Sequence, residues 1–262
     1  MDYKSMRFEI RDSVAWITIN RPQAYNAIDS QATSEFYDIA NRCSVDRSVR
    51  AVVLTGAGER AFCAGGDVAE FARSDNMELL VRKMTGDLHT AISRLAWLRA
   101  PVIAAVNGVA AGAGLSLAAC ADLVIASDTA KFTSAYTHIG LTPDGSSTFF
   151  LTRLLGRRRV LELYMTNRVL SAQEALDWGL VNRVVPAADL MAEVTKLATQ
   201  LAKGPTQAFG GIKKLVMMAP NDTLESQMER ETRIIAEMST TQDAREGIKA
   251  FTEKRKPNFI GE

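Results

Sequence analysis

The longest uncharged stretch of the chain, residues 100–121, is the feature that most limits the folds open to it. These twenty-two residues between Arg99 and Asp122 are enough to cross a bilayer as a helix, and they contain a G-x-x-x-G motif from Gly108 to Gly112. Only six of them are Leu, Ile or Val, and a proline, an asparagine and many small residues interrupt the stretch, so insertion into lipid would gain little. The stretch therefore predicts the buried core of a soluble protein rather than a membrane span.

Strand-like segments alternate with helical ones on both sides of this stretch. Four short apolar runs have the composition of buried strands: Val14–Ile19, Arg50–Thr55, Pro101–Val106 and Leu123–Ala126. Helical patterns accompany them, one capped at Asp29 or Ser30, one over Leu88–Leu98 and one over Leu115–Cys120. Because the connections are too long for hairpins, the pattern predicts an α/β protein with parallel strand pairing.

Helices dominate the chain after Ser146. Ser171 and Glu174 form a capping box at the start of a short helix that ends at Gly179. Three further helices are predicted: Leu190–Leu201, Leu224–Met238 capped by Asp222 with Glu225, and a final helix from Asp243 to Lys254. We therefore expect two parts, an α/β core over residues 1–195 and a helical region over residues 196–262.

The charge balance and the cysteines exclude several classes of protein. Thirty-one Lys and Arg against 30 Asp and Glu leave a net charge of +1, which argues against a nucleic-acid-binding or membrane-surface protein. Cys43, Cys63 and Cys120 lack C-x-x-C spacing, so we expect free thiols in a reducing compartment, with neither a disulfide nor a metal site. Residues 1–10 lack the apolar region of a secretory signal, and a cytoplasmic location is the expectation.

Two short motifs resemble catalytic signatures but stand in the wrong context. Gly56–Ala61 matches the G-x-G-x-x-A dinucleotide fingerprint, yet a small-residue loop follows it where a long helix should begin. Gly114–Ala118 is close to the G-x-S-x-G motif of hydrolases, and Asp122 and His138 follow in hydrolase order. The preceding strand ends too far from Ser116 for a nucleophile elbow, so a structural role for this serine is favoured.

Two glycine-rich loops are better candidates for chemistry. Ala61–Asp67 and Asn107–Gly114 each follow a predicted strand and lack side chains that would shield the backbone N–H groups. The second loop opens onto a helix near Leu115, whose free terminal amides suit a developing oxyanion. Close packing of backbone against backbone is the other explanation for the glycines, and the residues alone leave both open.

A series of motifs along the chain resembles the enoyl-CoA hydratase/isomerase (crotonase) family in order and in spacing. The likeness covers nearly the whole chain and is carried by these segments: Asn20–Pro22 with Asn26–Ala27, Ala61–Asp67, Pro101–Gly108 with Gly112–Gly114, Gly140–Asp144, Ala172–Ala175 with Trp178–Asn182, and Phe251–Lys256. The resemblance implies a spiral of ββα units in two near-perpendicular sheets, with C-terminal helices that build a homotrimer or a dimer of trimers. It also implies an acyl-CoA thioester as ligand, with no metal and no cofactor beyond the substrate's own coenzyme A.

The resemblance assigns roles to individual residues. The two N–H groups of an oxyanion hole fall on Gly66 and Ala113, where Ala113 replaces the family's more usual glycine. Coenzyme A contacts are implied for Gln23, Ala24 and Asn26 along the pantetheine, for Ala64 and Gly65 at the adenine, and for Phe251 and Lys254 reaching a neighbouring subunit's site. The lysines that family members place near the CoA phosphates are absent, since Gln23 and Ala69 stand there.

Hydration and isomerisation require catalytic carboxylates at different positions of the family pattern. Family hydratases use two glutamates, and their positions hold Ser116 and Tyr136, which we expect to line the acyl cavity or donate a hydrogen bond. Asp144 stands where family isomerases, such as ring-epoxide phenylacetyl-CoA isomerases, carry a catalytic acid/base. We therefore expect double-bond isomerisation, with Asp144 as the base and Gly66 and Ala113 as the oxyanion hole.

Several alternatives stay open at this point. Thr142–Gly145 is also a good β-turn, in which Asp144 would merely cap the helix that begins near Ser146. Hydration would require a further carboxylate, for which Glu70 is the nearest candidate. An acyl-CoA hydrolase, a ring-modifying enzyme on the same fold, and a non-catalytic RNA-binding or CoA-binding protein are the remaining possibilities.

Overall fold

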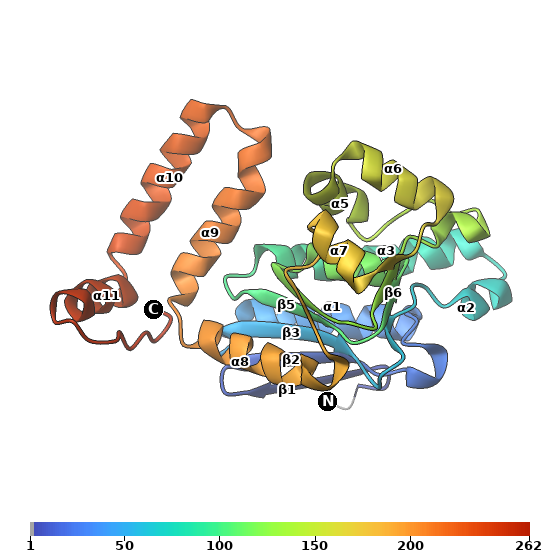
Figure 1. Ribbon diagram of the computed structural model, residues 1–262, viewed down its shortest axis with the longest axis horizontal. Helices are drawn as coiled ribbons and strands as arrows, with labels where there is room; N and C mark the ends of the chain where they lie inside the picture. The colour runs from blue at the N-terminus through green and yellow to red at the C-terminus, as the bar shows by residue number, and fades with distance from the viewer. Residues whose placement is uncertain (1–2) are drawn as a thin grey trace.

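The computed structural model describes residues 3–262 and contains two sheets surrounded by helices (Figure 1). The larger sheet has the strand order β1-β2-β3-β5-β7-β10, and its strands are β1 (Met6–Arg11), β2 (Val14–Ile19), β3 (Ala51–Gly56), β5 (Val102–Val106), β7 (Leu123–Ser127) and β10 (Arg183–Val185). The smaller sheet has the order β4-β6-β8-β9, with β4 (Ala61–Cys63), β6 (Val109–Ala111), β8 (Lys131–Thr133) and β9 (Leu170–Ser171).

The helices follow the strands in a repeated pattern. In the first part of the chain they are α1 (Ser30–Val45), α2 (Val68–Arg73), α3 (Met77–Trp97), α4 (Ala113–Cys120), α5 (Ser147–Leu155), α6 (Arg157–Thr166) and α7 (Ala172–Trp178). After β10 they are α8 (Leu190–Ala202), α9 (Thr206–Met218), α10 (Leu224–Ser239) and α11 (Gln242–Thr252). Short 3-10 turns, η1 (Pro22–Ala24), η2 (Tyr136–Ile139), η3 (Ala187–Asp189) and η4 (Ala219–Asn221), complete the described chain.

Three successive ββα units form a spiral. β3 and β4 lead to α2 and α3, β5 and β6 lead to α4, and β7 and β8 lead to α5. The first strand of each pair joins the larger sheet and the second joins the smaller one, while strands of successive units pair in parallel. The spiral of ββα units expected from the motifs is thereby confirmed.

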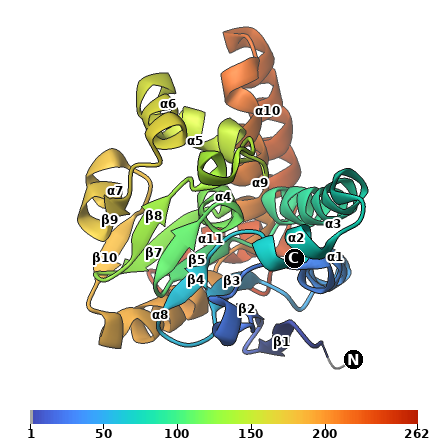
Figure 2. The same cartoon turned by 90° about the vertical axis from the view of Figure 1, so that its right-hand side faces the viewer.

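Both faces of the larger sheet are buried, which explains the continuous apolar runs of its strands. Alternate residues of β3 face opposite sides, so Val53 packs with Leu190 and Val194 of α8, while Val52 and Leu54 belong to the main core with α1, α3 and α4. Figure 2 shows α8 on one side of this sheet and α4 on the other. The four strands expected from composition are all present.

The N-terminal hairpin and the short strands β4 and β6 were not predicted from the sequence. β1 pairs antiparallel with β2 through a turn at Asp12 and Ser13, which both adopt positive φ (51° and 61°) although neither is a glycine. β4 and β6 have only three residues each and lie within segments that the sequence suggested were loops. Gly56–Ala61 is accordingly a strand-to-strand turn, and the dinucleotide fingerprint is excluded.

Two helix caps differ from the sequence prediction. Thr223 rather than Asp222 caps α10, because the Thr223 side chain accepts from the N–H of Ser226, whereas Asp222 pairs with Arg230 at 2.5 Å. Thr241 caps α11, so the helix begins at Gln242 and not at Asp243. The buried carboxylate of Asp243 accepts hydrogen bonds from the N–H groups of residues 260 and 261 and fastens the end of the chain.

The C-terminal helices extend from the core as a separate arm (Figure 1). α9 and α10 lie side by side and α11 closes the arm, while α8 remains on the sheet. Residue 195, the boundary expected between the two parts of the chain, lies inside α8. The arm exposes large apolar side chains: Ile212, Val216, Leu224, Met228, Ile235, Ile248 and Phe251. None of the described helices is both long and apolar enough to cross a membrane.

A partly buried ion pair joins this arm to the core. The Nζ atom of Lys213, on α9, lies 2.6 Å from a carboxylate oxygen of Asp122, which directly precedes β7. The Lys213 side chain is 10% exposed and the Asp122 side chain is 28% exposed. The same ammonium donates to the backbone carbonyls of Leu95 and Ala100. Asp122 in turn accepts from the N–H of Val102 in β5. The pair thus links α9, α3 and two central strands.

Replacing Lys213 by methionine should destabilise the fold by about 1–3 kcal/mol, because the partly exposed Asp122 carboxylate would lose its partner and the carbonyls of Leu95 and Ala100 would lose a donor. Lys214→Met, at the next and exposed position, serves as the matched control and should change the free energy of unfolding by less than about 0.5 kcal/mol. Urea unfolding followed by circular dichroism measures both. Equal stability of the two variants would contradict the importance given to the pair.

Candidate active site

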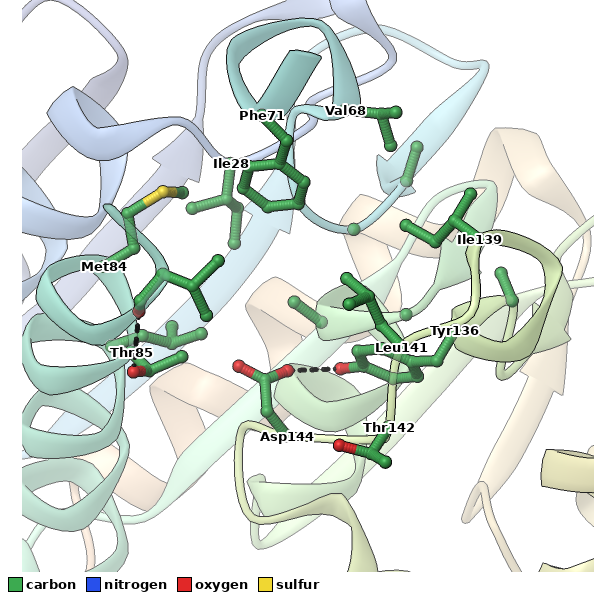
Figure 3. A pocket seen from close by; sticks show the side chains of 18 of the residues that line it. Ile28, Val68, Phe71, Met84, Thr85, Tyr136, Ile139, Leu141, Thr142 and Asp144 are labelled. Atoms are coloured by element: carbon green, nitrogen blue, oxygen red, sulfur yellow. Dashed lines mark hydrogen bonds between the residues drawn. The ribbon is translucent and has the colours of Figure 1, made fainter. Parts of the chain in front are cut away.

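A cavity of about 400 Å³ lies between the two glycine-rich loops, α2, α3 and the segment around η2 (Figure 3). Most of its wall is apolar. The lining residues are Ile28, Thr33, Ala64, Gly65, Gly66, Val68, Phe71, Val81, Met84, Thr85, Leu88, Gly112, Ala113, Ala135, Tyr136, His138, Ile139, Leu141, Thr142 and Asp144. Among these described residues Asp144 is the single carboxylate. The cavity therefore offers an apolar space with one carboxylate in its wall.

The two glycine-rich loops meet at the wall of this cavity. Gly65 has φ +103°, and a Cβ there would lie 3.2 Å from the carbonyl oxygen of Ala111. Gly114 allows the first turn of α4 to approach β4, since a Cβ at this position would lie 2.0 Å from the Cys63 carbonyl oxygen. Close backbone packing, one of the two explanations that the sequence left open, is therefore a role of these glycines, and it brings the two loops together.

The backbone amides of Gly66 and Ala113 face no backbone acceptor in residues 3–262. Around Gly66 the chain forms a bridge with Ile28, in which the N–H of Ile28 and the N–H of Asp67 are the donors, so the amide of Gly66 takes no part. Ala113 is the first residue of α4, where a helix leaves its N–H unpaired. Two free donors thus belong to residues that line one cavity, and the dipole of α4 favours negative charge beside one of them.

The carboxylate of Asp144 lies in the cavity and is held by Tyr136. The Tyr136 hydroxyl donates to Oδ1 of Asp144 at 2.6 Å, as Figure 3 shows. The turn itself is held by the backbone carbonyl of Asp144, which accepts from the hydroxyls of Ser116 and Ser147, both at 2.9 Å. The side chain of Asp144 does not cap α5, whose first turn follows Ser146. The carboxylate is therefore left available for chemistry.

Tyr136 is fixed as a hydrogen-bond donor. Burial, followed by the charge of Asp144 and the hydrogen bond to it, raises the pKa of Tyr136 well above its usual value. The phenol therefore keeps its proton at neutral pH. Ser116 lies 3.2 Å from the same hydroxyl, is fully buried and does not line the cavity, so it supports Tyr136 and the Asp144 turn from behind.

His89 is the residue of the site that the sequence analysis missed. Its Nε2 atom lies 3.6 Å from Oδ2 of Asp144 and accepts a hydrogen bond from the N–H of Gly145 at 3.1 Å. One signal was present in the sequence, because His89 follows Thr85 by four residues and so lies on the same face of α3 as cavity residues. Its partner Asp144 lies 55 residues further along the chain, so no local sequence pattern predicts their contact.

The other residues implied for coenzyme A lie outside the cavity wall. Gln23 is exposed and Ala24 is partly buried in η1, next to the loop that contains Ala64. Phe251, 86% exposed, and Lys254 lie at the end of the arm opposite to α2 (Figure 1). In a single chain they do not meet the cavity.

The side chain of Asn26 has a structural role. It is buried, its Oδ1 accepts from the N–H of Arg21 at 3.0 Å, and its Nδ2 donates to the carbonyls of Ala57 and Ala61 at 3.0 and 2.7 Å. Arg21 in turn pairs with Asp67 at 2.9 Å, beside Gly66. Asn26 and Arg21 thus hold the first glycine-rich loop in place.

Other candidate groups are engaged elsewhere. The carboxylate of Glu70 accepts from the N–H and the hydroxyl of Ser30 at the start of α1 and does not line the cavity. Cys43, Cys63 and Cys120 are free, as expected, and they are buried. Burial raises the pKa of Cys63 to about 12, so this thiol is a poor nucleophile. The described residues contain no cluster of three or more metal-ligating side chains.

Known proteins of one family match nearly the whole chain. The family model for enoyl-CoA hydratase/isomerase matches residues 9–262. A probable enoyl-CoA hydratase of Rhodobacter capsulatus is 38% identical over 262 residues, 100% of either chain. The 1,2-epoxyphenylacetyl-CoA isomerase of Escherichia coli is 36% identical over 257 residues, 96% of this chain and 97% of its own. The solved structure of an enoyl-CoA hydratase from Bacillus anthracis has a TM-score of 0.93 at 33% identity, covering 99% of this chain and 100% of that one.

Asn26→Ala should lower the free energy of unfolding by about 3 kcal/mol, because three buried hydrogen bonds of about 1 kcal/mol each are lost. Gln23→Ala, on the same segment but exposed, should change it by less than about 0.5 kcal/mol. Thermal and urea unfolding of both variants check this. If the Asn26→Ala protein were fully stable but bound ligand more weakly, Asn26 would be a substrate contact and not a structural residue.

Proposed function

Because the chain belongs to the enoyl-CoA hydratase/isomerase family and is an enzyme that acts on acyl-CoA, we propose that it moves a carbon–carbon double bond within an enoyl-CoA. The observation that carries the proposal is the position of Asp144, the one carboxylate among the described lining residues of the cavity that also contains the free amides of Gly66 and Ala113. One base and two oxyanion donors are what an allylic proton shift requires.

The thioester carbonyl is the first group to be recognised. Its oxygen accepts from the N–H groups of Gly66 and Ala113, which also stabilise the negative charge that develops on it. This stabilisation makes the proton on the α-carbon acidic. The apolar wall formed by Phe71, Met84 and Leu88 holds the acyl group and excludes water from it.

Asp144 carries the proton between two carbons. Its carboxylate removes the α-proton, and the electron pair of the C–H bond moves into a dienolate whose charge rests on the thioester oxygen. The protonated Asp144 then donates to the γ-carbon, the carbonyl re-forms, and the double bond has moved by one position with no net change in oxidation state. The donor Tyr136 holds the carboxylate in place between these two steps.

Hydration is less well supported by the same geometry. Addition of water requires one group to activate the water and another to protonate the α-carbon. Ser116 is buried behind Tyr136, Tyr136 keeps its proton, and Glu70 is bound to α1. The relative named as an isomerase agrees with isomerisation, while the relatives named enoyl-CoA hydratase agree with hydration.

Hydrolytic chemistry is the second candidate, and the observation that favours it is His89 beside Asp144. A carboxylate with an imidazole 3.6 Å away can act as a nucleophile whose acyl or aryl adduct is then cleaved by water. Release of free acid or of a ring substituent from saturated and aromatic CoA thioesters would favour this reaction over isomerisation.

We further propose a homotrimer or a dimer of trimers. The exposed apolar side chains of the arm support self-association, because a monomer would leave them in water. Phe251 and Lys254 lie on or directly after α11, where they could reach a neighbouring site.

Asp144→Asn should lower kcat for the conversion of a 3-enoyl-CoA to the 2-enoyl-CoA by about 10²–10⁴-fold, because the amide cannot accept the α-proton. Tyr136→Phe and Ser116→Ala should lower kcat much less, since neither transfers the proton. Absorbance of the conjugated thioester measures the rates. Full activity of Asp144→Asn would overturn the proposal and leave Asp144 as a turn residue.

An enoyl-CoA should bind at least about tenfold more tightly than the corresponding free acid, because only the thioester offers a neutral carbonyl to the two amides and a free carboxylate is repelled by Asp144. Calorimetry with the thioester, the acid and free coenzyme A measures the three affinities. Equal affinity for acid and thioester would speak against a thioester site.

A further inference from the structure

A second cavity of about 560 Å³ lies on the other side of the Asp144 turn from the acyl cavity. It is lined by His89, Ile92, Ser93, Ala96, Trp97, Ser146, Phe149, Phe150, Met217, Met218, Asn221 and Asp222. Its polar members include Ser93 and Asn221, which are exposed, so water has both access and hydrogen-bond partners there. Neither the family activity nor the proposed reaction assigns a use to this space.

Helix α3 runs along both cavities. Thr85 and Leu88 line the acyl cavity, while His89, Ile92 and Ser93 line the second one. His89 is thus the first residue of α3 on the second cavity, and its side chain is half exposed. The imidazole stands at the boundary between the two spaces.

The Asp144 turn forms the remainder of this boundary. Asp144 lines the acyl cavity and Ser146 lines the second, and the N–H of Gly145 between them donates to Nε2 of His89. Because the lone pair of that nitrogen accepts this hydrogen bond, the nitrogen carries no proton in this arrangement, and it can receive one when the ring turns away from the Gly145 N–H. Oδ2 of Asp144, the oxygen not bound to Tyr136, lies 3.6 Å away.

We propose that His89 is a proton relay that connects Asp144 with the water of the second cavity. While the acyl group fills the first cavity, the protonated Oδ2 passes its proton to Nε2 of His89, and the imidazolium releases a proton to water on its other side. Reprotonation runs along the same path in reverse, so charge and atoms balance. The gap of 3.6 Å is about half an ångström longer than a hydrogen bond, which a small rotation of the ring or one bridging water closes.

This inference rests on the proposed function, because Asp144 must be the base. Its consequence is that the proton taken from the α-carbon is exchanged with solvent before the γ-carbon is protonated. When 3-enoyl-CoA that contains no deuterium reacts in D2O, the product should therefore carry deuterium at the γ-carbon. Mass spectrometry measures the fraction of product that contains deuterium, and NMR locates it on the γ-carbon.

The test compares wild type with His89→Gln. In wild type most product molecules should carry γ-deuterium, and in His89→Gln the ratio of exchange to turnover should fall roughly tenfold, because glutamine cannot take up a proton. KM should change little, since His89 lies outside the acyl cavity. Ser93→Leu, an exposed position four residues along α3, should lower the same ratio by filling the second cavity next to His89.

Lys83→Gln is the matched control, because Lys83 is exposed on the same helix and lines neither cavity. Its ratio of exchange to turnover should equal that of wild type. An unchanged ratio in His89→Gln, a wild-type product without γ-deuterium, or an equal fall in the control would each overturn the relay. Full activity of Asp144→Asn would instead overturn the proposed function, which keeps the two failures distinguishable.

Discussion

The site depends on a backbone-to-backbone contact between α4 and β4. At Gly114 a Cβ would stand 2.0 Å from the carbonyl oxygen of Cys63, and at Gly108 one would stand 2.6 Å from the carbonyl of Arg60, so neither position admits a side chain. This contact brings the free amides of Ala113 and Gly66 into one cavity. It also explains the uncharged, small-residue stretch 100–121, which provides close packing between the two sheets and not a path through lipid.

Much of the fold could be predicted from the sequence, because the central strands are buried on both faces. Such strands have continuous apolar composition, and the four that were expected are present. The β1–β2 hairpin was missed since its turn uses Asp12 and Ser13 at positive φ, where the usual signal is glycine or asparagine. The caps of α10 and α11 were misplaced by one or two residues, because Asp222 and Asp243 lie within two residues of Thr223 and Thr241 and both residue types are common helix caps.

The candidate site was predictable only in part, and the limit is physical. Asp144 and the two loops were found through a pattern that extends along the chain. Asn26 belongs to the same pattern, but its buried side chain donates to backbone carbonyls and holds the first glycine-rich loop. An asparagine that contacts a ligand and one that holds the backbone look the same in the sequence. His89 faces Asp144 only because α3 passes the Asp144 turn, a contact between distant segments that carries no sequence motif.

The spiral has a consequence for how the enzyme is formed. Each ββα unit gives one strand to each sheet, so neither sheet can be completed before the chain has passed through all three units. Parallel pairing between units makes nearly every sheet contact long-range in sequence, and a high proportion of long-range contacts slows folding. The oxyanion amides come from the first and second units, and the base comes from the third, between β8 and α5. Catalytic activity should therefore be the last property to appear during refolding, after secondary structure has formed.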